Sequence, residues 1–386
     1  MMSRAERSYF TDWWWTVDRW FVFSLAALMV IGIVLVLAGS PPIAEKLGLP
    51  PFHFVNRQLI YLAPAIALML ATSFLSPRLV RRAALFVFLL GMAGVVFALF
   101  FGVEIKGARR WVFGLQPSEF VKPAFVIIAA WAFSEGARRN DVPANMLAML
   151  LLPMTIVPLI LQPDFGQTML ISSVWASLFF MAGLHWFWVG GIGGIGAAGV
   201  FAAYRFLPHV RERFDRFLDP GNGPGTSDTF QVDIATESFL SGGWFGKGPG
   251  EGTYKRILPD SHTDFIFAVT GEEFGIIACI ILMSLFAFIV LRGLLLASRN
   301  ADPFCRFATA GLVVLLGLQS AINMAVNLSL MPAKGMTLPF ISYGGSSLLA
   351  TALGMGFLIA VTRRRPKSEL LGAMDEQGIA SKTGNR

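Results

Sequence analysis

Ten mostly apolar stretches, separated by short polar segments, dominate this chain. A helix of about 17–25 apolar residues can cross a bilayer, because it satisfies its own backbone hydrogen bonds inside lipid. The fourth and fifth stretches are short, so we expect their helices either to extend into the flanking residues or to lie tilted. The apolar runs are continuous rather than alternating, which favours helices over a membrane β-barrel. We therefore predict an all-α integral membrane protein of about ten transmembrane helices, at Trp20–Gly39, Gln58–Leu75, Ala83–Gly102, Phe120–Phe133, Met146–Leu161, Thr168–Gly183, Trp186–Tyr204, Phe265–Leu291, Phe307–Leu330 and Ser346–Thr362.

The overall composition agrees with one large membrane domain. Charged residues make up 14% of the 386 residues, and the mean hydropathy is +0.63. Soluble domains carry about 25% charged residues. We expect an N-terminal segment over residues 1–19, a membrane domain over 20–365 and a C-terminal tail over 366–386.

The distribution of Lys and Arg predicts the orientation. With the N-terminus inside, the inner segments carry 17 of these residues and the outer segments, apart from one long loop at about 205–263, carry 7. Cytoplasmic loops are enriched in Lys and Arg, while long loops cross the membrane regardless of charge. Both termini are therefore expected in the cytoplasm and the long loop outside. The net charge of +7 is explained by this bias and by anionic membrane lipids, so it gives no reason to expect nucleic acid as a partner.

A carboxylate, Asp264, stands where the long polar loop runs into the apolar stretch that begins at Phe265. Asp260 and His262 precede it closely, so polar groups gather there beyond the needs of a helix cap, and we expect His262 to contact substrate. The alternative is that Thr263 or Asp264 only caps the next helix. These residues alone leave both interpretations open, and the resemblance described below favours a functional carboxylate at the membrane surface.

Cations gather in the loop between the third and fourth stretches, and a charged pair follows at the start of the next helix. Positive charge on the outer side runs against the inside bias, and Arg matches phosphate oxygens well. A phosphate-bearing ligand and internal pairing with Glu104 and Glu119 are equally favoured. The cations are Lys106, Arg109 and Arg110, and the pair is Glu119 and Lys122.

The segment Pro332–Ser347, PAKGMTLPFISYGGSS, joins the last two stretches and contains a single charge, Lys334. Its prolines and glycines prevent a regular helix, and irregular backbone at membrane depth needs protein or a wet cavity around it. We expect its hydroxyl and N–H groups to line a polar site near Asp264. A merely structural turn is the alternative.

Three further features have their own interpretations. Glu272 and Glu273 lie about 12–13 Å along the helix after Asp264, where burial in lipid favours pairing with Lys or Arg over a proton or ion path. Asp164, in the turn Gln162–Thr168, is expected to cap the following helix. The glycines between Gly190 and Gly199 are expected to allow close helix packing.

Taken together, these residues make the chain resemble the SEDS family of bacterial cell-wall proteins over about residues 20–365. The resemblance is carried by GGWFGKGPG (Gly242–Gly250), LPDSHTDFIFAVTGEEFG (Leu258–Gly275) and the Pro332–Ser347 segment. The Lys334–Pro339 wording is closer to the division branch of the family than to its elongation branch. Three long motifs in the family's order make a chance match very improbable.

The resemblance implies ten transmembrane helices and peptidoglycan glycosyltransfer from lipid II at the inner membrane, during septal cell-wall synthesis. The family's essential aspartate falls on Asp264, and its cationic and polar site positions fall on Arg110, Glu119, Lys122, Lys334 and Ser342. It also implies a class B penicillin-binding protein as transpeptidase partner, with other division proteins, and a divalent cation such as Mg2+ or Mn2+.

The chemistry of that substrate suggests a role for Asp264. Forming a β-1,4 linkage from an α-linked sugar pyrophosphate inverts the reacting carbon, so a single displacement suffices. Asp264 is the expected general base. Two other functions stay open: a flippase that moves lipid II, which would depend on Glu272 and Glu273, and a non-catalytic scaffold of the division complex.

Overall fold

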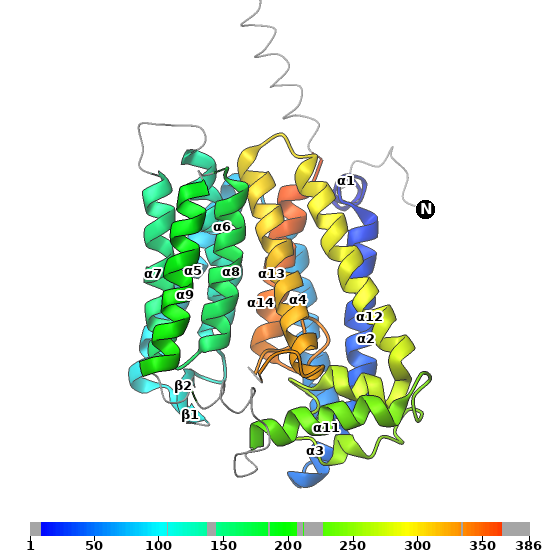
Figure 1. Cartoon of the computed structure of the whole chain (residues 1–386). Helices are drawn as coiled ribbons and strands as arrows, with labels where there is room; N and C mark the ends of the chain where they lie inside the picture. The colour runs from blue at the N-terminus through cyan, green and yellow to red at the C-terminus, as the bar shows by residue number, and fades with distance from the viewer. Residues whose placement is uncertain are drawn as a thin grey trace, which may run out of the picture.

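The computed structural model describes residues 9–105, 107–136, 144–183, 186–206, 211, 227–332 and 335–364. Apart from one small hairpin, the regular structure in this part of the chain is helical, and most helices run side by side as a bundle (Figure 1). Lys334 and the tail 366–386, both singled out in the sequence, lie outside the described residues.

Each of the ten predicted spans coincides with a helix, usually with longer ends. The short fourth and fifth spans extend as predicted, to Pro117–Gly136 and Ala144–Leu161. Seven of the described helices are long and apolar enough to cross a membrane, and α8 is a shorter apolar helix. The bundle helices are α2 (Arg19–Gly39), α4 (His53–Ser73), α5 (Pro77–Phe101), α6 (Pro117–Gly136), α7 (Ala144–Leu161), α8 (Phe165–Met181), α9 (Trp186–Phe206), α12 (Ile266–Ser298), α13 (Pro303–Asn327) and α14 (Gly345–Thr362).

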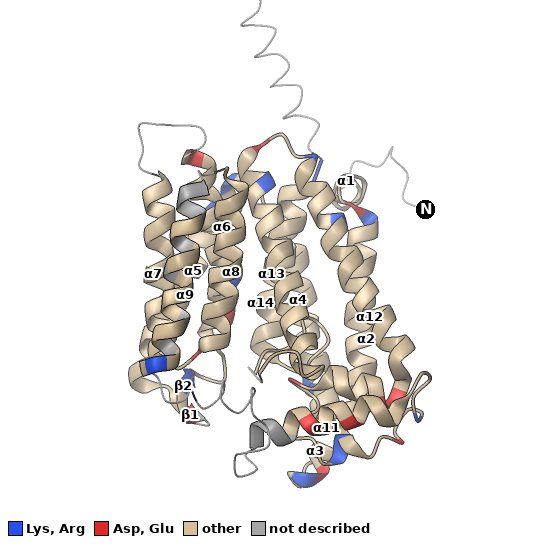
Figure 2. Cartoon of the chain, viewed as in Figure 1, with Lys and Arg blue, Asp and Glu red and all other residues tan. Residues whose placement is uncertain are grey.

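The centre of the bundle is formed by α13 and α14, which are mostly buried, with α6 and α4 packed against them. By contrast, most of α7 faces outward. The described charged side chains gather mainly at the two ends of the bundle (Figure 2). This distribution is expected for helices that cross lipid, where charges away from the interfaces are costly.

One end of the bundle, which we call the terminal face, holds both ends of the described chain. A short helix, α1 (Tyr9–Thr16), lies there, and the indole of Trp13 donates to Ser73 Oγ at 2.8 Å. The amide of Arg364 donates to the carbonyl of Thr16 at 3.1 Å. Thus the first helix and the end of the last one are tied together, and both ends of the described chain lie on the same face.

The opposite end, the loop face, carries the hairpin β1 (Val103–Ile105) and β2 (Ala108–Trp111), the short helix α3 (Pro41–Lys46) and helix α11 (Ser227–Gly242). Helix α11 lies crosswise to the bundle helices (Figure 1). The segment 331–344, of which the structure describes 331–332 and 335–344, joins α13 to α14, and its described residues also lie on this face. Neither α3, α11 nor the hairpin was predicted from the sequence, because none of them contains a long apolar run.

Helix α12 is kinked at Gly275, whose φ of 80° and ψ of 178° are not helical. A β-carbon there would lie 2.4 Å from the carbonyl oxygen of Trp244 and 2.5 Å from the amide nitrogen of Gly246. Glycine therefore permits both the backbone conformation and the close approach. The kink also corrects the predicted depth of Glu272 and Glu273. Both lie before it, in Ile266–Phe274, which we call the crosswise part of α12, and not in the straight part Ile276–Ser298.

The glycines of α9 do not pack as predicted. A β-carbon at Gly190, Gly191, Gly193, Gly194, Gly196 or Gly199 would meet no atom of the described chain within 4 Å. The predicted close packing of these glycines is therefore not seen among the described residues.

The kink gives a first prediction. Gly275→Ala should lower the melting temperature of the purified protein in detergent, because a left-handed residue with a β-carbon costs about 1–3 kcal/mol before any overlap is relieved. Gly190→Ala is the matched control and should be neutral or slightly stabilising, since alanine is favoured over glycine inside a helix by about 0.5–1 kcal/mol. Equal melting temperatures for Gly275→Ala and the wild type would contradict this account.

Candidate functional site

Asp264 lies in a tight turn on the loop face, two residues before α12 begins at Ile266. It is half-buried, and its amide donates to the carbonyl of Asp260 at 3.1 Å. Its carbonyl accepts hydrogen bonds from the side-chain amides of Asn323 and Asn327, each at 2.9 Å. The backbone that carries the carboxylate is thus fixed from α13.

The carboxylate itself faces the 331–344 segment. A β-carbon built on Gly335 would lie 3.5 Å from Asp264 Oδ2, in ordinary contact. The sequence prediction that this segment and Asp264 share a site is therefore supported by their proximity. Lys334, the predicted cation of the segment, is the residue before Gly335 in the chain but is not among the described residues.

Three buried amide side chains on α13 hold this region together, and we call them the amide stripe. Gln319, Asn323 and Asn327 are spaced four residues apart, so they share one helix face. Besides Asp264, Asn323 Nδ2 also reaches the carbonyl of Met336 at 2.5 Å, and Gln319 Nε2 donates to the carbonyl of Thr337 at 3.0 Å.

Asn327 completes the stripe by accepting, through Oδ1, a hydrogen bond of 3.1 Å from the amide of Ala268. The stripe therefore binds two chain segments, the 331–344 segment and the start of α12, to one rigid helix. Sequence reasoning missed it, although amides at four-residue spacing within an apolar span were a visible signal.

The 331–344 segment enters the bundle and is held by its own side chains. Ser342 is buried, and its Oγ accepts from the amide of Leu338 at 2.8 Å. The hydroxyls of Thr337 and Ser347 are 2.7 Å apart. The segment packs closely on α2 because residue 32 is a glycine. A β-carbon at this position would lie only 2.2 Å from the carbonyl oxygen of Phe340. Ser342, predicted to bind substrate, is thus engaged inside the segment.

His262 is also engaged in packing. Its ring forms a three-membered cluster with those of Phe54 and Tyr343, at centroid distances of 4.4 and 5.4 Å, and its carbonyl accepts from the Tyr343 amide at 2.9 Å. Burial lowers the pKa of His262 to about 4, with a smaller opposing effect from Asp260. Its Nδ1 has no hydrogen-bond partner within the described chain. His262, which was predicted to contact substrate, therefore packs against other groups of the protein.

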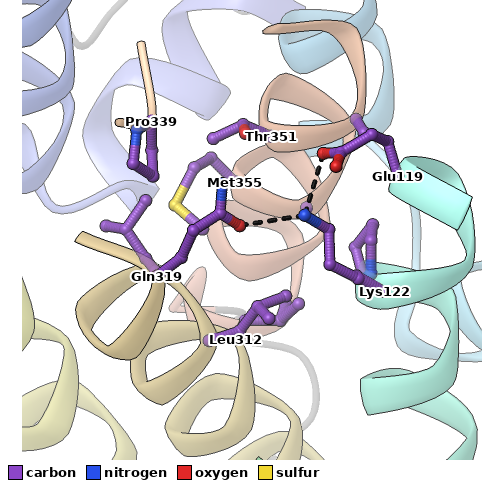
Figure 3. Close-up of a pocket in the computed structure, with 12 residues that line it drawn as sticks. Glu119, Lys122, Leu312, Gln319, Pro339, Thr351 and Met355 are labelled. Atoms are coloured by element: carbon purple, nitrogen blue, oxygen red, sulfur yellow. Dashed lines mark hydrogen bonds and ion pairs between the residues drawn. The ribbon is translucent and has the colours of Figure 1, made fainter. Parts of the chain in front are cut away.

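Glu119 and Lys122 occupy the first turns of α6 and form a buried ion pair of 2.8 Å. Lys122 Nζ also donates to Gln319 Oε1 at 3.1 Å, and Gln167 Nε2 donates to Glu119 Oε1 at 2.6 Å. Figure 3 shows Lys122 reaching both Glu119 and Gln319. The predicted pair is thus joined through Gln319 to the same amide stripe that holds Asp264. Hydrogen bonds and opposite charges of this kind keep buried charges tolerable in a low dielectric.

A pocket of about 330 Å³, counting its open mouth, lies beside this pair. Its walls come from α6, α13 and α14, together with Pro339 of the 331–344 segment (Figure 3). Glu119, Lys122 and Gln319 are its charged or amide-bearing lining residues, and most of the others are apolar, including Leu312, Leu315, Leu316 and Met355. The pocket is therefore apolar with a polar edge.

Arg110, on β2, is hydrogen-bonded to the turn between α7 and α8. Its Nε donates to the carbonyl of Gln162 at 3.1 Å and its Nη2 to that of Pro163 at 2.5 Å, and Nη1 lies 3.7 Å from Asp164 Oδ1. Asp164 caps α8 as predicted, by accepting from the Gln167 amide at 3.4 Å. Burial raises the pKa of Asp164, and the Arg110 charge offsets part of that rise.

The cations of this region therefore follow the internal-pairing alternative. Arg109 pairs with Glu104 at 3.4 Å, Lys122 with Glu119, and Arg110 with Asp164 rather than with a glutamate. Lys106 lies outside the described residues.

Glu272 and Glu273 are paired, as favoured from the sequence. Glu272 accepts backbone hydrogen bonds from Thr253, Tyr254 and Lys255 at 2.5–3.0 Å, and Glu273 forms a buried ion pair with Lys255. Lys255 Nζ also reaches the carbonyl of Ala38 on α2 at 3.1 Å. The two glutamates clamp the 247–256 loop onto the crosswise part of α12.

The sequence matches the family model of the cell cycle proteins FtsW, RodA and SpoVE over residues 19–367. It is 45% identical to the probable peptidoglycan glycosyltransferase FtsW of Caulobacter vibrioides, over 98% of this chain and 96% of that protein. It is 35% identical to the protein of the same description from Geobacter metallireducens, over 88% of this chain and 92% of that one.

Two solved structures are similar in fold. A chain of a peptidoglycan synthase complex superposes with a TM-score of 0.74 and 28% identity, over 90% of this chain and 97% of that chain. The rod shape determining protein RodA of Thermus thermophilus gives 0.65 and 27%, with the same coverage. The chain therefore belongs to the FtsW/RodA/SpoVE family, the SEDS family that its motifs resemble. It shares the enzyme class of its curated relatives, peptidoglycan glycosyltransferase.

The burial of His262 predicts a pH dependence of stability. An unfolded histidine takes up a proton near pH 6.5, whereas folded His262 does so only near pH 4. The unfolded state therefore binds more protons between these values, and stability should fall as the pH drops from 6.5 to 4, by about 3 kcal/mol in all. His262→Phe should remove this part of the slope in melting temperature against pH. Identical slopes for the variant and the wild type would contradict the prediction.

We predict that removing one amide of the stripe increases the local mobility of the backbone that it binds. Asn327→Ala removes the hydrogen bonds to the Asp264 carbonyl and the Ala268 amide, at a cost of about 1–3 kcal/mol. Hydrogen exchange measured by mass spectrometry should be faster in the peptide that covers residues 260–270. Ser320→Ala is the control, because that hydroxyl bonds the Leu316 carbonyl of its own helix. Unchanged exchange in Asn327→Ala would show that the stripe does not hold this turn.

Proposed function

We propose that the chain polymerises lipid II into glycan strands and that Asp264 is the general base of the reaction. The observation that carries this proposal is the placement of Asp264. A half-buried carboxylate stands at one end of a membrane-crossing bundle, on a backbone fixed by Asn323 and Asn327. A base held in this way keeps its position while the substrate arrives, which is a requirement for efficient proton transfer.

The reaction follows from the substrate. The donor sugar is α-linked to a pyrophosphate on a polyprenyl chain, and the product linkage is β-1,4, so the reacting carbon is inverted. One displacement achieves this: the acceptor 4-hydroxyl attacks, its proton passes to Asp264, and the pyrophosphate leaves with the bonding electrons. A positioned general base contributes typically about 10²–10⁴-fold.

The leaving pyrophosphate needs positive charge nearby. We propose Lys334 for this role, because it precedes Gly335, whose backbone lies against the Asp264 carboxylate. Lys122 and Arg110 are both bonded to protein groups. We therefore assign them to shaping the site through α6 and the α7–α8 turn, with direct substrate contact requiring those bonds to exchange.

The lipid tail requires an apolar surface that reaches the loop face. The pocket between α6, α13 and α14 meets this need, since its apolar lining begins beside the Glu119–Lys122 pair. We propose that the tail lies along this pocket or the neighbouring helix grooves while the head group reacts.

A divalent cation would fit only with help from the substrate. Within the described chain, no group of three or more His, Cys, Asp or Glu side chains is arranged to hold a metal ion. Mg2+ commonly takes one or two carboxylates and completes its shell with phosphate oxygens and water. We assign no reaction step to a metal here.

The partner and the location follow from the relatives. A similar chain belongs to a complex that coordinates polymerization and crosslinking, and on this ground we propose a transpeptidase of the class B penicillin-binding type as partner, with other division proteins. The identity to division-type relatives supports a septal role in the inner membrane. Together with the Lys and Arg bias, the shared terminal face supports cytoplasmic termini and an outer loop face.

The flippase alternative was based on Glu272 and Glu273 lying at depth in the membrane. Glu272 and Glu273 do not lie within the membrane-crossing part of α12, and both are bonded to Lys255 or to backbone amides of the 250–256 loop. A scaffold without activity would not require a carboxylate at residue 264.

The proposal is tested by Asp264→Asn. Purified with its partner and supplied with lipid II, the variant should lose at least about 10²-fold in polymerisation rate while still binding lipid II. Asp233→Asn, an exposed aspartate on α11, is the matched control and should polymerise normally. Normal polymerisation by Asp264→Asn would reduce Asp264 to a structural residue of the turn.

A further inference from the structure

The turn Gly242–Gly248, which joins α11 to the 247–256 loop, lies across the kink of α12 and is hydrogen-bonded to the helix on both sides of it. On one side of Gly275, the amides of Lys247 and Gly248 donate to the carbonyls of Glu272 and Glu273, at 2.9 and 3.0 Å. On the other side, the turn accepts instead: Gly243 accepts from the Ile276 amide at 2.9 Å and Trp244 from the Ile277 amide at 3.3 Å. The backbone of the turn thus replaces helix hydrogen bonds that the kink interrupts.

Glycines allow this close contact. A β-carbon at Gly242 would lie 2.0 Å from the carbonyl oxygen of Gly271, and one at Gly246 would lie 2.2 Å from that of Glu273. Because the turn's backbone faces α12, the side chains between these glycines are directed away from it.

Those side chains are two consecutive aromatics, Trp244 and Phe245, which are 65% and 83% exposed. Exposed tandem aromatics on a rigid turn need an explanation, because such surface is costly in water. They adjoin Ile277, and the exposed apolar surface of α12 continues through Ile280 and Ile281. The aromatic pair is therefore the end of a surface that faces lipid.

The length of α12 places this pair at the edge of the bilayer. The straight part after the kink, Ile276–Ser298, spans about 34 Å at 1.5 Å per residue. This is close to the thickness of the hydrocarbon core, about 30 Å. The kink, and the turn strapped to it, thus coincide with the membrane interface on the loop-face side, where amphipathic aromatic rings such as tryptophan are enriched.

We propose that Trp244 and Phe245 form a membrane-interface anchor that inserts into the leaflet on the loop-face side. The anchor fixes the height of the kink and, through the crosswise part of α12, the height of the turn that carries Asp264. Its occupant is the lipid head-group and acyl boundary of the protein's own bilayer.

Site-directed spin labelling tests the insertion. Phe245→Cys is labelled with a nitroxide in the full chain, with the two native cysteines, both buried, replaced by alanine, in nanodiscs of phosphatidylethanolamine and phosphatidylglycerol. The label should be more accessible to oxygen than to a water-soluble nickel chelate. Its depth should lie between those of two controls: Glu251→Cys in water and Ile281→Cys in lipid.

Two outcomes overturn the anchor. Nickel accessibility at residue 245 equal to that at 251 would place the turn in water, and protection from both reagents would show that protein covers it. An independent measurement needs no cysteine substitution: brominated lipids should quench the fluorescence of the wild type more than that of Trp244→Phe. Equal quenching would also overturn the proposal.

An activity assay tests the consequence of the anchor for the reaction, and this assay depends on the proposed polymerase function. The double variant Trp244→Ser, Phe245→Ser should polymerise lipid II at least about tenfold more slowly in liposomes, and Trp244→Phe, Phe245→Trp should restore the rate. Leu240→Ser, on the exposed side of α11, is the control. An inactive wild type would refute the proposed function and leave the depth measurements intact. Unaltered polymerisation by the double variant, with insertion observed, would refute the link from the anchor to the active site.

Discussion

The hydrogen bonds from the amide stripe to the backbone of two loops are the constraint on which the site depends. An irregular segment cannot enter a membrane bundle unless its polar groups find partners in protein. Gln319 and Asn323 supply such partners to Thr337 and Met336, while Asn323 and Asn327 supply them to Asp264. Since all three amides project from α13, a central helix of the bundle, the turn that carries Asp264 is held to a buried helix through its backbone.

The same helix also connects the two charged regions of the protein. Gln319 uses its oxygen for Lys122 and its nitrogen for Thr337, so a single side chain joins the buried pair on α6 to the loop beside Asp264. A buried ion pair is expensive to desolvate and contributes little net stability on its own. The Glu119–Lys122 pair places a carboxylate and an ammonium group at the edge of a largely apolar pocket.

The spans could be predicted from the sequence because the lipid requirement leaves a simple signal, a long apolar run. The pairing of Glu272 and Glu273 could be predicted as well, since buried carboxylates need cations. Their depth could not, because a glycine such as Gly275 is as common inside a straight membrane helix as at a kink, and only the docked Gly242–Gly248 turn decides between them.

Site residues were predicted unevenly for a related reason. Asp264 stood out as a charge at a boundary, but whether His262, Ser342 or Arg110 turns toward substrate or toward protein depends on contacts between segments far apart in the chain, such as Phe54 with His262. The amides of α13 were overlooked because neutral side chains in an apolar span attract less notice than charges, although their regular spacing carried the information.

The tie between the two chain ends on the terminal face has a topological consequence. The amide of Arg364 donates to the carbonyl of Thr16, so the end of α1 and the residues that follow α14 are in contact. A short linker could close the backbone into a ring at this point without crossing the bilayer. The chain could then be reopened on the same face, in the Arg299–Asp302 connection between α12 and α13, which would yield a circular permutant whose first span is α13, the helix that organises the site.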